Sequence, residues 1–360
     1  MNFFIKNDCI KNTIFFHKIF TKSFSLSIKT FICLFFIFYI LFFYQNNCFA
    51  FTKSEYSINS SHLYIFKFKP TEVRLIPYLN DYPIKARDVV NYYNPFLLVN
   101  GTFFYSNKLL GALYMHGEPL SYMGDKRATF YYYKNNTANI NYLKYRVKLN
   151  ICSSTSSCKI LYLDGVNRPQ NYYENILYTN GYSRPVLPTS GILLKINEDG
   201  TFEYLYTRSA IPSPGEYILL ANHDLDVLNN LNPTDRISVS IEPEINNNLD
   251  FYISGGPMLL FNSQNVALQS SKNEYIVNDI KMGNHMRTGL GIDSASNIYV
   301  FAVSYPGCTI DELASVLQNI GLKNAMLLDG GYSTVLYERD MFLVGSEARA
   351  NISYLMFFIN

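Results

Sequence analysis

The sequence predicts an α+β protein, a single domain with a large mixed β-sheet and a β-α-β unit near its C-terminus. Three observations support this prediction. Between residues 57 and 206, short runs of β-branched and aromatic residues are separated by Gly- and Asn-rich turns, without helical periodicity. Between residues 298 and 328, an apolar strand, a capped helix and a second apolar strand follow one another. No repeat or linker divides residues 51–360, so one composite domain is expected.

The individual elements follow from local pattern and turn residues. Residues 51–94 are expected to form lead-in strands and a short helix, and residues 95–358 the main body of the domain. Apolar or alternating runs bounded by turn residues predict strands. The predicted strands lie within 57–75 and at 97–99, 111–122, 128–133, 142–149, 160–163, 176–178, 191–196, 201–206, 218–220, 236–241 and 251–253. Short helices are predicted at 86–94 and 224–231.

The β-α-β unit has the clearest local signals. Ile298 to Val303 is an uncharged strand, Thr309 and Glu312 have capping-box spacing, and Gly321 ends the helix. The helix has one apolar face, made of Leu313, Val316, Leu317 and Ile320. A second apolar strand follows at 325–328, and a crossover of this kind makes its two strands run parallel in one sheet. This places Asp329 just past the carboxyl end of a strand, where α/β sheets usually hold their ligands.

The first fifty residues have the composition of a secretory signal. Five lysines and one Asp precede or flank an uncharged run at residues 31–44, and Cys48-Phe49-Ala50 has small residues at the positions that a signal peptidase recognises. We expect cleavage after Ala50, with an uncleaved anchor formed by residues 31–44 as the alternative. In both cases the domain is exported, either secreted or held in the periplasm or cell envelope.

Charge and cysteine spacing exclude several classes of site. Without residues 1–50, the chain has 25 basic and 27 acidic residues, a net charge of −2, so no basic surface for nucleic acid is expected. Cys152 and Cys158 bracket a polar loop, and an exported location favours a disulfide between them. Cys308 is then free. Histidine and acidic residues show no metal-ligand spacing, and no cofactor is expected.

Four glycine-containing turns follow apolar strands. Any one of them is most simply an ordinary turn. Taken together with His285, Arg287 and Thr288, they indicate a site, because strand-end glycines leave backbone N–H groups uncovered and several such groups can cradle an anion. The four turns are Asn100-Gly101, Asn180-Gly181, Gly255-Gly256 and Gly330-Gly331.

Seven motifs occur in an order that resembles a known family. They are NGTFF (100–104), GVNRP (165–169), LYT (177–179), SGGP (254–257), HMRTGLG (285–291), ELASVLQNIG (312–321) and NAMLLDGGYST (324–334). Over residues 95–358 the chain resembles the phosphodiester glycosidases, the family of the enzyme that removes the covering N-acetylglucosamine from mannose 6-phosphate tags.

The chain also departs from the usual pattern of that family. Tyr332 interrupts a run of three glycines, Met286 stands where a Pro is common, and Ser304 to Gly307 replaces an acidic Asp-Gly-Arg loop. These differences make the sequence similar to a shorter-looped bacterial branch.

The resemblance implies cleavage between a sugar's anomeric carbon and a phosphodiester oxygen. Arg287 is expected to bind the phosphate, and His285 to donate a proton or contact the phosphate. Asp329 is expected to act as nucleophile, as the base that activates water, or as stabiliser of the oxocarbenium-like centre. The substrate-binding residues implied are Asn100, Gly101, Thr179, Gly255, Gly256, Thr288, Gly330, Gly331 and Ser333.

The expected partner is a sugar phosphodiester or a surface polysaccharide, and a membrane is contacted only through an uncleaved N-terminal segment. The alternative hypothesis is a catalytically silent carbohydrate-binding or envelope-assembly protein that keeps the fold. Tyr332 and the Ser304 to Gly307 loop favour this alternative, whereas the presence of Asn100, Arg287 and Asp329 opposes it.

Overall fold

A computed structural model describes residues 51–360 except 106, 107, 123–126, 155, 156, 171, 172, 183, 189, 208, 243 and 347. The predicted signal or anchor, including its apolar run at 31–44, lies outside the described residues. Within the described ranges, no helix is both long and apolar enough to cross a membrane.

The prediction of an α+β domain with one large mixed sheet is wrong, because the described chain is mainly β and its strands form six separate sheets. The largest sheet has seven strands, and every neighbouring pair in it is antiparallel. Its order is β1 (Phe51–Ile58), β2 (Ser61–Phe68), β23 (Ile298–Cys308), β22 (His285–Asp293), β24 (Leu322–Leu327), β20 (Met258–Phe261) and β21 (Gln264–Asn265).

Three sheets have five strands each. The first is ordered β26 (Met341–Val344), β25 (Leu336–Glu338), β4 (Leu97–Asn100), β27 (Asn351–Ile359) and β3 (Val73–Ile84). The second is ordered β10 (Ala138–Tyr142), β9 (Ala128–Tyr133), β19 (Leu249–Ser254), β7 (Leu113–Met115) and β8 (Glu118–Ser121). The third is ordered β13 (Gly165–Val166), β14 (Ile176–Tyr178), β17 (Glu216–Ala221), β15 (Ile192–Asn197) and β16 (Phe202–Tyr204).

Two smaller sheets and a few short helices complete the described chain. The sheets are β12 (Cys158–Tyr162), β11 (Arg146–Cys152) and β18 (Arg236–Glu242), and the hairpin of β5 (Phe104–Tyr105) and β6 (Lys108–Leu109). A disulfide joins Cys152 to Cys158 at the ends of β11 and β12. The helices are α2 (Ala86–Tyr93), α3 (Leu225–Asn229), α4 (Ala267–Asn273), α5 (Asn278–Met282) and α6 (Ile310–Ile320), with 3-10 turns η2 (Pro70–Glu72) and η3 (Gly331–Ser333).

The strand-helix-strand unit near the C-terminus consists of β23, α6 and β24. Thr309 and Glu312 form the capping box, and Gly321 ends α6 in the left-handed conformation. β23 and β24 run in the same direction, but they are not neighbours, because β22 lies between them and is antiparallel to both. The sequence pattern predicts that β23 and β24 run in the same direction. It does not predict that β22 lies between them, because β22 precedes the unit in the chain.

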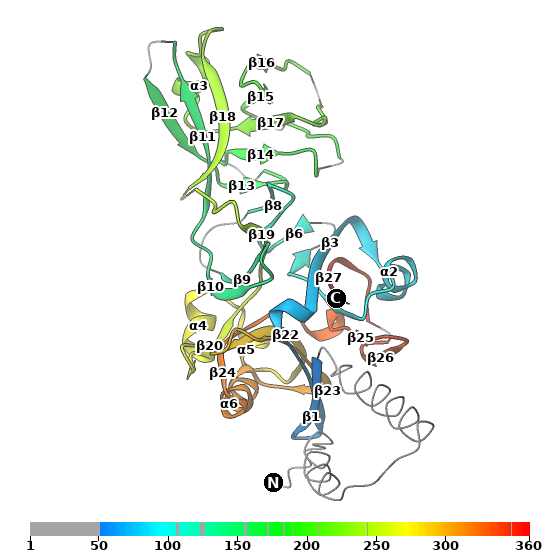
Figure 1. Cartoon of the computed structure of the whole chain (residues 1–360). Helices are drawn as coiled ribbons and strands as arrows, with labels where there is room; N and C mark the ends of the chain where they lie inside the picture. The colour runs from blue at the N-terminus through cyan, green and yellow to red at the C-terminus, as the bar shows by residue number, and fades with distance from the viewer. Residues whose placement is uncertain are drawn as a thin grey trace, which may run out of the picture.

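The sheets are arranged along an elongated molecule (Figure 1). The sheets containing β11 and β14 lie at one end, and the seven-stranded sheet, with α4 and α6, lies at the other. One apolar core joins the seven-stranded sheet to its neighbours through Phe66 of β2, Phe130 of β9 and Phe357 of β27. A second core fills the far end around Leu149 and Leu177. The lead-in strands belong to these layers, since β2 pairs with β23 and β3 with β27.

Candidate active site

A cavity of about 190 Å³ opens where β24 ends, and Asp329 lies in its wall. It brings together six residues that the sequence analysis singles out, three of which carry charge or can do so. Its lining is Phe103, Gly256, Asp279, Ile280, His285, Arg287, Leu327, Leu328, Asp329, Gly330 and Gly331.

The chain turns sharply after β24 in order to present Asp329. Leu328 N–H donates to the oxygen of Thr288 (2.9 Å), and Asp329 N–H donates to that of Gly101 (3.2 Å), so Asp329 is held between two other segments. The turn η3 follows at once. Gly331 has φ +58°, a left-handed conformation that favours glycine, and no atom lies within 4 Å of the place where its Cβ would be. The glycine therefore serves the backbone geometry and leaves open space beside the carboxylate.

The Asp329 carboxylate is bound on both oxygens. Its Oδ1 accepts from Gly330 N–H (2.9 Å), and its Oδ2 accepts from Arg349 Nη2 (3.1 Å). Only 8% of the residue is exposed. Burial raises the pKa of Asp329 above its usual value, while the Ser333 hydroxyl, Arg349 and Gly330 N–H each lower it in part. The result is a desolvated carboxyl group that still has a cation beside it.

Arg349 is a site residue that the sequence analysis did not identify. Besides Asp329, its guanidinium binds the Ser333 hydroxyl from Nε (2.6 Å) and lies 4.5 Å from the centre of the Phe104 ring. Its main-chain N–H donates to the oxygen of Tyr332 (3.0 Å), and its side chain is half exposed. Arg349 lies in a loop without a recognisable motif, so no local signal marks it, and only the fold places it beside Asp329.

Asn100 supports Asp329 from behind and is fully buried. Its Nδ2 donates to the main-chain oxygen of Asp329 (2.7 Å), and its Oδ1 accepts from the Thr288 hydroxyl (2.7 Å) and from Val335 N–H (3.0 Å). The amide therefore joins β4, β22 and the turn after β24. With these bonds to the protein, Asn100 and Thr288 support the site and are not part of the cavity lining.

Arg287 lines the cavity, but most of its guanidinium is engaged by the backbone. Nε donates to the oxygen of Cys308 (3.1 Å), and Nη2 donates to those of Ile280 (2.9 Å) and Gly283 (2.7 Å). Burial lowers the pKa of Arg287 to about 10, so it remains a cation at neutral pH. Nη1 makes no hydrogen bond to the described part of the chain, which leaves one nitrogen for a ligand. Arg287 thus fastens the segment around α5 to the edge of β22 and β23.

His285 stands at the start of β22, on the same wall as Arg287. Its Nε2 lies 3.1 Å from the main-chain oxygen of Asp279 and 3.5 Å from the Asp279 carboxylate. Gly307, at φ +98°, packs so closely that a Cβ there would come within 2.0 Å of the His285 backbone. Ser304 to Gly307, predicted as a loop, instead lies within β23, and Gly307 packs directly against the His285 backbone.

The floor of the cavity at Gly256 rests on a buried carboxylate, Glu274. Glu274 accepts from Met258 N–H (2.8 Å), Ala128 N–H (2.9 Å) and the Ser270 hydroxyl (2.5 Å). A Cβ at Gly256 would lie 2.4 Å from Glu274 Oε2, and this glycine also has φ +128°. Burial raises the pKa of Glu274. The Ser-Gly-Gly-Pro turn therefore needs glycine at position 256 for close packing over Glu274, while Gly255 packs against the oxygen of Leu327.

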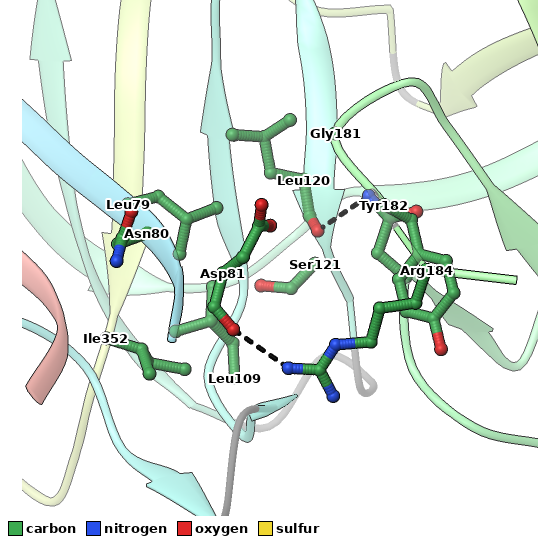
Figure 2. Close-up of a pocket in the computed structure, with 11 residues that line it drawn as sticks. Leu79, Asn80, Asp81, Leu109, Leu120, Ser121, Gly181, Tyr182, Arg184 and Ile352 are labelled. Atoms are coloured by element: carbon green, nitrogen blue, oxygen red, sulfur yellow. Dashed lines mark hydrogen bonds between the residues drawn. The ribbon is translucent and has the colours of Figure 1, made fainter. Parts of the chain in front are cut away.

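Other predicted site residues lie behind the cavity or away from it. Gly101 and Ser333 contact Asp329 or Arg349 without lining the cavity. Thr179 directly follows β14 and exchanges hydrogen bonds with the Asn167 side chain (2.8 and 2.9 Å). Asn167 and Gly181 line a second, much smaller cavity of about 40 Å³, across which Arg184 reaches the oxygen of Asp81 (Figure 2).

No cluster of three or more His, Cys, Asp or Glu side chains able to hold a metal ion occurs among the residues that the structure describes.

The buried thiol of Cys308 lies beside Arg287. Burial raises the pKa of this thiol to about 12, so Cys308 stays protonated at neutral pH.

Comparison with known proteins gives one family match, over part of the chain. Residues 190–353 match the family model described as phosphodiester glycosidase. No curated protein matches the chain.

Three solved structures are similar to the chain. A hypothetical protein from Synechocystis aligns with a TM-score of 0.70 and 17% identity over 86% of this chain and 62% of its own. A protein from Burkholderia pseudomallei, named for its expected export, aligns with a TM-score of 0.67 and 17% identity. The alignment covers 83% of this chain and 74% of that protein. The third structure is the catalytic domain of zebrafish N-acetylglucosamine-1-phosphodiester α-N-acetylglucosaminidase, auto-inhibited by its pro-peptide. It aligns with a TM-score of 0.44 and 12% identity, over 86% of this chain and 82% of that domain.

The chain spans 62% of the length of the Synechocystis protein, and the first two likenesses show the fold alone. The family match covers Gly256, His285, Arg287, Asp329 and Arg349. Over residues 190–353, the family model thus agrees with the resemblance to phosphodiester glycosidases that the order of the motifs predicts.

Proposed function

We propose that this chain is an exported hydrolase that cleaves the bond between a sugar's anomeric carbon and a phosphodiester oxygen in an envelope or extracellular glycoconjugate. One observation carries the proposal: Asp329, Arg287 and His285, from three separate motifs, line one cavity. The family match supports the type of reaction. In this reaction water adds to the anomeric carbon, the carbon–oxygen bond breaks, and the phosphate leaves as a monoester.

Asp329 is the group proposed to face the anomeric carbon. Its carboxylate is nearly buried, and a carboxylate in a desolvated site interacts strongly with a developing positive charge. The raised pKa makes the carboxylate a stronger base or nucleophile than a solvated aspartate, and the neighbouring Arg349 favours its ionised form. These features support all three roles, as nucleophile, as base for water and as stabiliser of the oxocarbenium-like centre.

The departing phosphate is proposed to be stabilised by the cations of the cavity and its rim. Arg287 supplies one N–H from Nη1 and a buried positive charge, but no bidentate fork, since Nε and Nη2 are bound to carbonyl groups. Arg349, with half of its side chain exposed, is available for a further contact. His285 stands on the same wall and can donate a hydrogen bond or a proton.

The proposal is tested by measuring sugar release from an N-acetylglucosamine 1-phosphodiester and from a panel of nucleotide sugars. Wild type should release sugar from at least one of them, and Asp329→Asn and Arg287→Ala should reduce the rate by at least about 100-fold. Asp226→Asn, which changes an exposed aspartate on α3, is the matched control and should retain full activity. Lack of release by wild type from every substrate would support the silent carbohydrate-binding alternative, and release that survives Asp329→Asn would refute the site.

Export is tested separately by N-terminal sequencing of the protein recovered outside the cytoplasm. A sequence beginning at Phe51 is expected from cleavage after Ala50. An intact N-terminus in the membrane fraction would indicate the anchor, and protein confined to the cytoplasm would overturn the export proposal.

A further inference from the structure

We propose that Tyr332 forms an aromatic subsite at the mouth of the Asp329 cavity, where it stacks on the ring of the phosphorylated leaving group. The inference rests on the proposed function. It adds a preference for leaving groups that carry a sugar ring or a nucleobase, over leaving groups without a ring.

The backbone of Tyr332 is firmly placed. It is the middle residue of η3, between Gly331, which lines the cavity, and Ser333, which is fully buried. Its main-chain oxygen accepts from Arg349 N–H (3.0 Å), and Ser333 N–H donates to the oxygen of Gly330 (3.2 Å). The side chain therefore starts from a fixed point next to the cavity.

The ring of Tyr332, by contrast, has no structural task in the described part of the chain. The residue is 83% exposed. Its hydroxyl makes no hydrogen bond, and its ring makes no contact with another aromatic ring or cation, among the described residues. A tyrosine that stabilised the fold would pack its ring or bind its hydroxyl, as Tyr354 does by donating to the oxygen of Ile84 (2.6 Å). The Tyr332 ring is therefore exposed and free to pack against a ligand.

The size of the cavity requires part of the substrate to lie outside it. Pockets that enclose a whole drug-sized ligand usually measure about 300 Å³ or more, whereas this one measures about 190 Å³. With Asp329 in its wall, the cavity accommodates the sugar at the scissile bond. The group beyond the phosphate must then extend out of the cavity, and Tyr332 and Arg349 adjoin its lining residues Gly331 and Asp329.

The neighbours of Tyr332 match the two parts of such a leaving group. Arg349 is bonded to the Tyr332 backbone and carries a half-exposed guanidinium, which suits the phosphate. An aromatic face suits a ring, since stacking of bases on aromatic side chains does not depend on sequence-specific hydrogen bonds and a pyranose also presents C–H groups along one face. Because the main chains of Arg349 and Tyr332 are hydrogen-bonded, a cation and an aromatic side chain extend from adjacent points of the backbone.

The test compares leaving groups with and without a ring. N-acetylglucosamine 1-phosphate methyl diester lacks a ring beyond the phosphate, the glucose 6-phosphate diester adds a pyranose, and uridine diphosphate N-acetylglucosamine adds a nucleoside. Wild type should favour at least one ring-bearing substrate by kcat/KM. Tyr332→Ala should lower that preference about tenfold, mainly through KM, whereas Tyr332→Phe should keep it. Tyr206→Ala, which changes a tyrosine that is 94% exposed in another sheet region, is the matched control and should keep the preference.

Binding of the leaving groups alone separates this inference from the proposed function. Calorimetry with glucose 6-phosphate, uridine diphosphate and methyl phosphate needs no turnover. Weaker binding of a ring-bearing phosphate by Tyr332→Ala than by wild type, with methyl phosphate unchanged, supports the subsite even if no substrate is cleaved. Equal binding of the ring-bearing phosphates by both proteins, no binding by wild type, or an unchanged substrate preference in Tyr332→Ala would overturn it.

Discussion

Arg349 Nη2 lies 3.1 Å from Asp329 Oδ2, so a half-exposed cation is paired with a nearly buried carboxylate twenty residues earlier in the chain. The pair has opposing effects on Asp329, because burial favours the protonated carboxyl group and Arg349 favours the carboxylate. The same guanidinium binds Ser333, so one side chain contacts both Asp329, just before the turn η3, and Ser333, its last residue. The ionisation of Asp329 and the shape of the turn are thereby linked.

The first prediction concerns the pH dependence of activity in Arg349→Ala. Removing the cation takes away an interaction that lowers the pKa of Asp329, so this pKa should rise. If the ionised form of Asp329 is the active one, the acid limb of kcat/KM against pH should move to higher pH, and the rate at neutral pH should fall at least about tenfold. Arg349→Lys, which retains the charge, should move the limb less. An acid limb at the same pH in all three proteins would show that Arg349 does not control the ionisation of Asp329.

The second prediction concerns stability in Asp329→Asn. The folded-state pKa of Asp329 is raised, so above that pKa the ionised group destabilises the fold, and below its unfolded value of about 3.9 it has no such effect. The free energy of unfolding of Asp329→Asn should therefore exceed that of wild type at pH 7, and the difference should shrink as the pH falls towards 4. Urea unfolding at both pH values measures this difference. If the stability of Asp329→Asn relative to wild type were lower at pH 7 than at pH 4, the raised pKa of Asp329 would be contradicted.

The third prediction concerns Asn100→Ala. The substitution removes the partner of three buried groups, the oxygen of Asp329, the Thr288 hydroxyl and Val335 N–H. Each buried polar group without a partner costs about 1 to 3 kcal/mol, so the free energy of unfolding should fall by at least about 2 kcal/mol. Asn229→Ala, at an exposed position of α3, is the control and should change it by less than about 0.5 kcal/mol. Equal stability of the two variants in urea would show that Asn100 is not a structural support.

The sequence allowed the local elements and part of the site to be predicted, because these depend on nearby residues. Gly321 and the pair Thr309 and Glu312 mark the ends of α6 by spacing alone, and the structure has the helix at 310–320. The apolar strand before Asp329 is equally clear, since β24 is buried at five of its six positions. Residues in motifs, such as His285 and Arg287, were found in the same way.

The arrangement of the sheets was not predictable, because it depends on which distant strands pair. β22 separates β23 from β24, and β4 joins β25 and β27, although nothing in the local pattern of these strands specifies their neighbours. Many of the local strands were therefore predicted, while the single mixed sheet was wrong. Arg349 was missed for the same physical reason, since its role comes from the position of a motif-free loop beside Asp329.

The fourth prediction concerns Arg287→Lys, which separates the structural task of Arg287 from its charge. The guanidinium reaches three carbonyl groups, of Cys308 on β23 and of Ile280 and Gly283 in and after α5. A lysine ammonium carries the same charge on a single nitrogen and cannot span these positions together. The segment 278–285 should then open more often, so its amides should exchange hydrogen at least about tenfold faster, while those of β11 and β12 at the far end should not change. Activity should fall when this segment opens, because Asp279, Ile280 and His285 form one wall of the cavity. Unchanged exchange in 278–285 together with lost activity would instead assign Arg287 a direct role in binding the phosphate and none in holding the wall.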